Sequence, residues 1–231
     1  MKADFQMRDG SAILPAMRGL VHACTTVVGS RFRRNVPLAS ALGAGLALLS
    51  INPVLADPQK VWAAGAYSFS DELGGFRITG ASGSGARDDP LVITEELESA
   101  TPVTLTIRTT KPIKAFADAA EYANGIMYMR IEALNSSGKA WVEFEFELQE
   151  TLGQPSVFGD GLSFDQRNRN PDNIVSSNYA KFDRNFEPYD RLLFTQGNVD
   201  PLKTVEFEFL MTDYTPRWTF YLVQDPRIPS S

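Results

Sequence analysis

Residues Trp141 to Leu148 read WVEFEFEL, and this stretch decides the fold class. Four apolar side chains (Val142, Phe144, Phe146 and Leu148) alternate with three acidic ones (Glu143, Glu145 and Glu147). Side chains alternate between two faces with this period only in an extended chain, so the stretch predicts a β-strand with an apolar face and an acidic face. A second stretch of the same kind, VEFEFLM, runs from Val205 to Met211. We expect the two strands to form the centre of a β-sandwich core.

Outward from these two stretches, the chain after residue 56 contains about nine short alternating segments separated by turn signals. This spacing predicts one all-β domain over residues 57–231, an antiparallel, jelly-roll-like β-sandwich. Residues 126–134 are expected to pair with 140–148 as a hairpin, because the five-residue loop between them contains glycine. Trp62, Trp141 and Trp218 fall within strand patterns and are predicted to lie in or near the core.

Residues 1–56 have the pattern of a leader rather than of the domain. A basic cluster at Arg31, Arg33 and Arg34 precedes an apolar run of about a dozen residues, followed by Pro53 and the small-residue site ending at Ala56. This order predicts a signal peptide and a periplasmic or secreted protein. The alternative is a membrane anchor, but a spanning helix needs about 20 apolar residues. Translation from Met17 and a twin-arginine export route both stay open.

Removal of the leader would change the chemistry of the chain. The leader holds six of the 22 Lys and Arg and two of the 28 Asp and Glu, so 16 basic and 26 acidic residues remain, a net charge near −10. Such a charge disfavours nucleic acid and anionic lipid as partners, and no stable membrane insertion of the mature chain is expected. Cys24 and His22 are the only residues of their types. A mature chain would therefore have no disulfide, no Cys or His metal ligand and no Ser-His-Asp triad.

The segment 151–179 interrupts the strand pattern and is rich in Gly, Asn, Asp, Ser and Pro. Long loops of this kind are often functional. Asp160, Asp165 and Asp172 supply the oxygen ligands that calcium prefers, and calcium is the one cofactor that these residues would suit. The spacing Asn168-x-Asn170-x-Asp172 resembles the start of an EF-hand loop. The match fails further on, because Asn173 stands where that loop needs glycine and Tyr179 where it needs glutamate. The same residue types also form turns without any metal.

Aromatic residues near strand ends provide the second candidate site. Tyr179, Tyr189 and Tyr214 lie in or beside loops rich in Asn, Asp and Arg, and exposed rings in such company stack on sugars or other flat ligands. The alternative interpretation is that these rings are core edges or loop anchors. The first interpretation predicts a non-enzymatic exported module that binds a glycan or a protein.

The acidic strand faces offer a third hypothesis. Glu143, Glu145 and Glu147, with Glu206 and Glu208, could supply the paired carboxylates of a polysaccharide hydrolase. A simpler interpretation is a solvated outer face, on which Arg108 and Arg130 form ion pairs with the glutamates. Like charges directly opposite one another destabilise a sheet, so the two acidic strands should not be neighbours. A structural envelope protein without a small ligand is the remaining hypothesis, and an enzyme is not expected.

Overall fold

A computed structural model describes residues 60–119, 121–165 and 173–229. The predicted leader, residues 1–56, lies outside the described residues. The strands are β1 (Trp62–Ala64), β2 (Tyr67–Ser70), β3 (Phe76–Ser82), β4 (Leu91–Leu97), β5 (Val103–Thr109), β6 (Ile126–Asn135), β7 (Glu143–Gln149), β8 (Leu162–Phe164), β9 (Val175–Ser176), β10 (Tyr179–Asp183), β11 (Arg191–Gly197), β12 (Thr204–Asp213) and β13 (Thr219–Arg227). Two of these, β8 and β9, lie within residues 151–179, which the sequence predicts to be a long loop.

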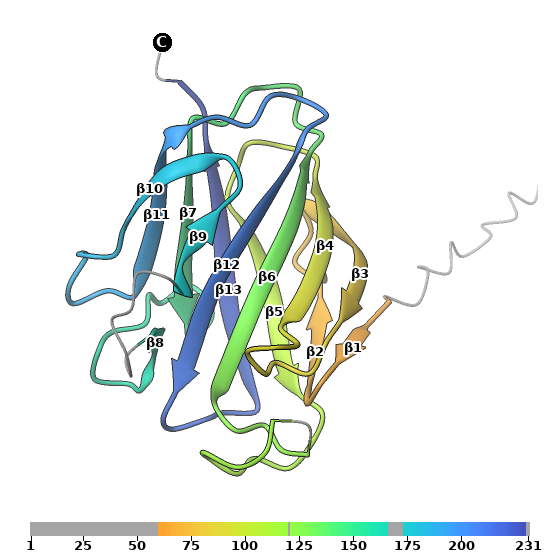
Figure 1. Cartoon of the computed structure of the whole chain (residues 1–231), viewed down its shortest axis with the longest axis vertical. Helices are drawn as coiled ribbons and strands as arrows, with labels where there is room; N and C mark the ends of the chain where they lie inside the picture. The colour runs from red at the N-terminus through yellow and green to blue at the C-terminus, as the bar shows by residue number, and fades with distance from the viewer. Residues whose placement is uncertain (1–59, 120, 166–172, 230–231) are drawn as a thin grey trace, which may run out of the picture. The chain divides into compact units, whose positions relative to one another are not determined.

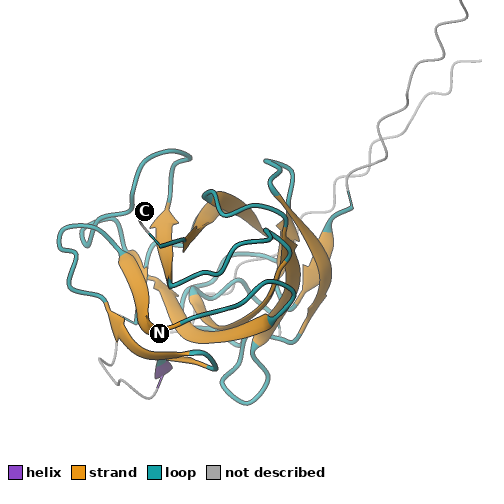
Figure 2. Cartoon of the chain, turned by 90° about the horizontal axis from the view of Figure 1, so that it is seen from above, coloured by secondary structure: helices purple, strands orange, loops and turns teal. Residues whose placement is uncertain are grey.

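The strands form two stacked sheets, which confirms the predicted β-sandwich (Figures 1 and 2). One sheet has the order β1-β2-β5-β13-β7-β11-β10, and the other has the order β3-β4-β6-β12-β8, with β9 also paired to β12. The prediction of a purely antiparallel arrangement is wrong at one place, because β4 and β6 run parallel. Between β4 and β6 the chain crosses to the other sheet, forms β5 there and returns. The two strands are therefore not joined by a hairpin, the connection that would make them antiparallel. The jelly-roll-like assignment stays a prediction.

The two aromatic-and-glutamate strands lie at the centre of the core, as predicted, and the structure places them opposite each other in different sheets. Phe144 and Phe146 of β7 and Phe207 and Phe209 of β12 are all buried. The ring centroids of Phe144 and Phe207 lie 4.6 Å apart, and those of Phe146 and Phe209 lie 4.9 Å apart. Because β7 and β12 belong to different sheets, their acidic faces point away from each other, as the repulsion between like charges requires.

Arginines on neighbouring strands pair with the outward glutamates. Arg191 Nε donates to Glu147 at 2.6 Å, and Arg130 Nε donates to Glu208 at 2.7 Å, which confirms the expected role of Arg130. Arg108 was predicted to join these ladders, but it pairs with Glu72. The reason is its place on β5, which lies next to β2 and β13 rather than beside β7 or β12. Partly exposed pairs of this kind contribute little to stability, about 0–1 kcal/mol each.

The predicted hairpin between residues 126–134 and 140–148 is wrong. β6 pairs with β4 and β12, whereas β7 pairs with β11 and β13 in the other sheet. Asn135 explains the change of sheet, because its buried side-chain amide donates to the carbonyls of Lys139 and Val199 at 2.8 and 2.9 Å. The chain is thereby held against the β11–β12 connection, where Trp141 pairs with Val199.

The three tryptophans divide between core and surface. Trp141 is buried and Trp62 packs against the core. Trp218, which was predicted to lie in or near the core, is 66% exposed. Trp218 lies in a bend before Thr219, the first residue of β13, so the alternation that buries Phe220 and Leu222 does not extend to it.

Gly125 should tolerate no side chain, because a Cβ there would lie 2.0 Å from the carbonyl oxygen of Asp213. The residue also has φ +74°, which is unfavourable for side-chain-bearing residues. We expect Gly125→Ala to lower the free energy of unfolding by roughly 2–4 kcal/mol. Gly74→Ala is the matched control, since Gly74 has φ +78° with nothing within 4 Å of its Cβ position, and it should lose about 1 kcal/mol. Equal losses in urea unfolding would contradict this account.

Candidate functional site

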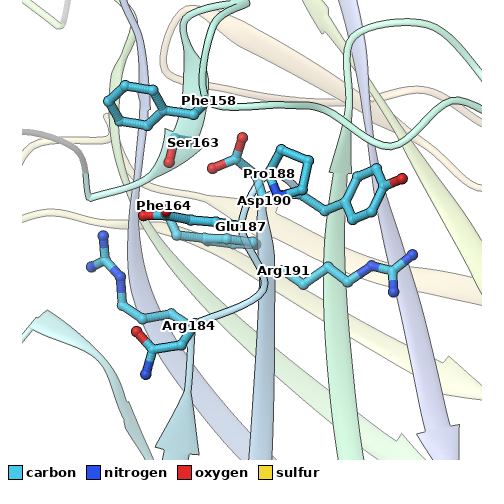
Figure 3. A pocket seen from close by; sticks show the side chains of 10 residues that line it. Phe158, Ser163, Phe164, Arg184, Glu187, Pro188, Asp190 and Arg191 are labelled. Carbon is cyan, nitrogen blue, oxygen red and sulfur yellow. The ribbon is translucent and has the colours of Figure 1, made fainter.

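A pocket of about 240 Å³ lies at one end of the sandwich, where three separate parts of the chain meet. They are the turn that contains Phe158, the strand β8 and the segment that leads into β11 (Figure 3). The lining residues are Phe158, Ser163, Phe164, Arg184, Asn185, Glu187, Pro188, Tyr189, Asp190 and Arg191. Both carboxylates and both guanidinium groups come from residues 184–191, so this segment supplies the charge of the pocket.

Asp190 is the buried acid of the pocket. Its backbone is fixed on two sides, because its N–H donates to the Ser156 carbonyl and its carbonyl accepts from the Leu148 N–H, each at 3.1 Å. The carboxylate lies on the same side of the pocket as Ser163 and Phe158 (Figure 3). Its Oδ2 atom is buried and has no hydrogen-bond partner among the residues that the structure describes. A buried acceptor without a partner is uncommon and costly, and it is therefore a candidate contact for a ligand donor.

The environment of Asp190 shifts its titration toward neutral pH. Burial raises the pKa of the carboxyl to about 6, and the hydrogen bond from Ser163 opposes that rise. The charge of Asp160 raises the pKa further, whereas the charge of Arg184 lowers it. Asp190 therefore changes from carboxylate to carboxylic acid within a pH range that many biological compartments reach.

Tyr189 supplies an accessible ring next to this acid. The residue is 45% exposed, and the guanidinium carbon of Arg191 lies 5.3 Å from its ring centroid. The backbone around the ring is fixed, since Val157 pairs with Tyr189 and the Phe158 N–H donates to the Pro188 carbonyl at 3.1 Å. Arg191 is itself held by Glu147. The ring and the acid are thus presented by an ordered wall.

The three tyrosines predicted to bind a ligand occupy different environments. Tyr189 lines the pocket. Tyr214 is 37% exposed and lies on a neighbouring loop, with its ring centroid 5.6 Å from that of Phe116. Tyr179 is buried, and its ring stacks on Phe207 at 6.0 Å. Tyr179, the first residue of β10, is therefore a core residue that packs on Phe194 and Phe207, and it is left out of the candidate site.

The predicted calcium ligands have roles in local structure. The Asp160 carboxylate accepts hydrogen bonds from the Ser156 hydroxyl and from the N–H groups of Val157 and Leu162, at 2.7–3.1 Å, and so closes a turn. Asp165 is buried and accepts from the Asn173 amide at 3.2 Å. Asp172 lies outside the described residues. Within residues 60–119, 121–165 and 173–229, no three His, Cys, Asp or Glu side chains converge as a metal site would require.

Sequence reasoning missed Asp190 and Arg184. Asp190 stands in the ordinary sequence Tyr-Asp-Arg at the start of a strand, and nothing local distinguishes it from a turn aspartate. Its significance comes from burial against Ser163, which lies far away in the sequence. The only available signal was the density of Arg, Asn, Asp and aromatic residues over 179–191, and that signal identified Tyr189 alone.

Fold and site together define a β-sandwich protein with a small polar pocket, walled by an exposed tyrosine, at one end of the sandwich. No protein-family model, curated protein or solved structure matches the chain. The structure contains, within its described ranges, no helix whose length and hydropathy would let it span a bilayer. Any functional assignment therefore depends on the chemistry of the site.

Proposed function

We propose that the protein is an exported, non-enzymatic binding module whose pocket takes one carbohydrate unit. The observation that supports this most is that one pocket is lined both by Asp190, whose buried Oδ2 has no hydrogen-bond partner among the described residues, and by Tyr189, whose ring is accessible. A sugar presents hydroxyl donors at its edge and C–H groups on its face. The carboxylate suits the former and the ring suits the latter.

The dimensions and charges of the pocket support the same ligand class. Its volume of about 240 Å³ is below the roughly 300–1,000 Å³ of pockets for drug-sized molecules, so a single ring fits better than an extended ligand. Two acids, Glu187 and Asp190, are balanced by two bases, Arg184 and Arg191. A neutral polyhydroxylated ligand is consistent with that balance. The strong negative charge predicted for the mature chain disfavours nucleic acid.

The test is binding of a panel of neutral methyl glycosides (gluco-, galacto-, manno-, xylo- and N-acetylglucosaminides), measured by isothermal calorimetry. We expect at least one to bind, and Asp190→Asn to weaken that binding by roughly 10- to 100-fold, since a charge-assisted hydrogen bond is lost. Asp190→Asn should stay folded, because it removes a buried charge. Asp200→Asn is the control, as Asp200 is exposed and its carboxylate accepts a hydrogen bond from the nearby Asn198 side-chain amide.

The pH dependence gives a second readout of the same contact. Because the pKa of Asp190 is raised to about 6, the carboxylate that accepts from the sugar is present above that value and is protonated below it. Affinity should therefore fall as the pH drops through about 6, and the asparagine variant should show no such fall. Failure of every glycoside to bind the wild-type protein would refute the proposed function.

A carboxylate-dependent polysaccharide hydrolase is the second candidate, favoured by one observation. The raised pKa of Asp190 is what a general acid needs, and Glu187 lines the same pocket as a possible partner carboxylate. Release of reducing ends from soluble polysaccharides separates the two candidates. Turnover that Asp190→Asn and Glu187→Gln both abolish would establish the enzyme, whereas binding without turnover supports the module.

A further inference from the structure

We propose that the natural ligand is a carbohydrate chain, with one unit in the pocket and the following units lying across a row of exposed aromatic rings. This inference depends on the proposed function and extends it from a single sugar to a polymer. The row consists of Tyr189, Phe158, Tyr214, Phe116 and Trp218, and is called the ring row below.

The ring row contains every large aromatic side chain that is exposed in the described part of the chain. Trp218, Phe158 and Phe116 are 66%, 67% and 58% exposed, and Tyr189 and Tyr214 are partly exposed. The other exposed large apolar residues are aliphatic: Val61, Leu73, Leu152, Val157, Val175, Leu202 and Ile228. Figure 1 places the loop between β5 and β6 and the turn between β12 and β13 at the same end, opposite the last residues of β13. A concentration of rings at one end marks a recognition surface.

Four members of the ring row, Tyr189, Phe158, Tyr214 and Phe116, are linked to the pocket through contacts that the structure shows. Tyr189 and Phe158 line the pocket, and the turn after Phe158 leads to Asp160 and Gly161. The Tyr214 N–H donates to the Gly161 carbonyl at 3.0 Å, and the Thr215 hydroxyl donates to the Asp160 carbonyl at 2.6 Å. The Tyr214 ring then contacts Phe116. These contacts place the loops that carry Tyr214 and Phe116 beside the pocket wall, on the path proposed for the ligand.

Phe116 is held in its exposed position by an ordered loop. It has φ +62°, which a bulky aromatic residue rarely adopts. Its N–H donates to the Asn124 carbonyl at 3.1 Å, while the Asn124 side-chain amide donates to the Ala117 carbonyl at 2.8 Å. Asn124 thus fixes the loop on both sides of Phe116. Unfavourable backbone geometry that presents a ring to solvent favours a binding role over chance exposure.

A carbohydrate chain fits these features better than a single sugar does. The pocket accommodates about one unit, so any contact with Tyr214 or Phe116 needs further units attached to it. Rings spaced along a surface stack on successive flat ligand units, and each such contact contributes about 0.5–1.5 kcal/mol, equivalent to roughly two- to tenfold in affinity. The carbohydrate chain would leave the pocket toward Gly161, because the Tyr214 N–H donates to the Gly161 carbonyl there.

The test compares ligand lengths. The probes are the cello-, xylo-, manno- and chito-series as mono-, di-, tetra- and hexasaccharides, with Kd measured by calorimetry. For the series that binds, we expect the wild-type hexasaccharide to bind roughly 10- to 100-fold more tightly than the monosaccharide. Phe116→Ala combined with Tyr214→Ala should reduce that ratio to about one- to threefold. Leu73→Ala, which removes an exposed aliphatic side chain at a turn between β2 and β3, should leave the ratio unchanged.

Two results would overturn the inference: a wild-type affinity that does not increase with length, or an increase that persists in the double variant. Phe116→Leu is the second variant; it keeps an apolar side chain in the loop but lacks a ring face, and it should also lower the ratio. Loss of monosaccharide binding in Asp190→Asn tests the pocket separately. If sugar binding does not depend on ligand length, the proposed function stands and the polymer inference is wrong. If no sugar binds, both are wrong.

Discussion

Replacement of Phe146 by alanine is expected to lower the free energy of unfolding by about 4 kcal/mol, the loss typical of a fully buried phenylalanine. Phe146 is at the centre of the aromatic core. Its ring centroid lies 4.9–6.1 Å from those of Phe144, Phe194, Phe207 and Phe209, which come from both sheets. Removing the ring leaves a cavity that neighbours on two sheets cannot fill without moving the sheets together.

Urea unfolding followed by tryptophan fluorescence measures this effect. Phe158→Ala is the matched control, because Phe158 is exposed and its truncation should change stability by no more than about 0.5 kcal/mol. The midpoint should shift strongly for Phe146→Ala with little change in slope. A loss below about 1 kcal/mol would mean that the two sheets do not pack through this cluster.

Replacement of Glu95 by glutamine is expected to stabilise the protein at neutral pH, by roughly 3 kcal/mol at about pH 7. Glu95 lies on β4 and is buried between the sheets, where its Oε2 accepts from the Gln224 side-chain amide at 3.0 Å. Burial raises the pKa of the carboxyl to about 8, and the hydrogen bond from Gln224 opposes that rise. The second carboxyl oxygen and the Gln224 Oε1 are buried, and within the described part of the chain neither has a hydrogen-bond partner.

The sign of the effect follows from proton linkage. Below the ordinary pKa of about 4.5, Glu95 is protonated in both the folded and the unfolded chain and has no effect on the difference between them. As the pH rises from there to about 8, the unfolded chain releases the proton first, so stability falls by about 1.4 kcal/mol per pH unit and then levels off. Glutamine cannot ionise, and it can exchange amide hydrogen bonds with Gln224 in both directions.

Thermal and urea unfolding of both proteins from about pH 4 to pH 9 would reveal this difference. The gap between variant and wild type should open with rising pH and be near zero at the acid end. Glu96→Gln is the control on the neighbouring residue, since Glu96 pairs with Arg77 and Ser136 and its pKa is lowered. That variant should show a change of the opposite sign. A constant gap for Glu95→Gln at every pH would show that the residue is not buried as an acid.

Glu95 also shows where reasoning from the sequence stops. Leu91 and Ile93 occupy inward positions of the strand pattern, and the Glu95-Glu96 pair that follows them indicates an acidic, exposed strand end. The structure continues β4 to Leu97 and so turns Glu95 into the core. A local pattern assigns a face by polarity. Only the partner strands decide whether a polar residue in an inward position is buried, and here Gln224 of β13 makes that burial tolerable.

The candidate site was predicted in part for a related reason. Tyr189 could be singled out as a ring beside charged residues in a loop, and the structure places it in the pocket wall. Tyr179 has the same kind of sequence context, yet it is buried against Phe207. Asp190 had no local signal at all. Exposure of a ring and burial of an acid are properties of the assembled sandwich, which single-residue context does not encode.

By itself, the sequence determined that this protein is a β-sandwich and which phenylalanines fill its centre. A period of two in side-chain polarity is a local property, and it fixes both strand and face without knowledge of partners. Only the tertiary structure decided that residues 126–135 pair with 204–213 rather than with 143–149, and that Asp190 meets Ser163 in a pocket at one end. The backbone hydrogen bonds of any two strands are alike, so the choice of partner depends on side-chain packing between distant segments.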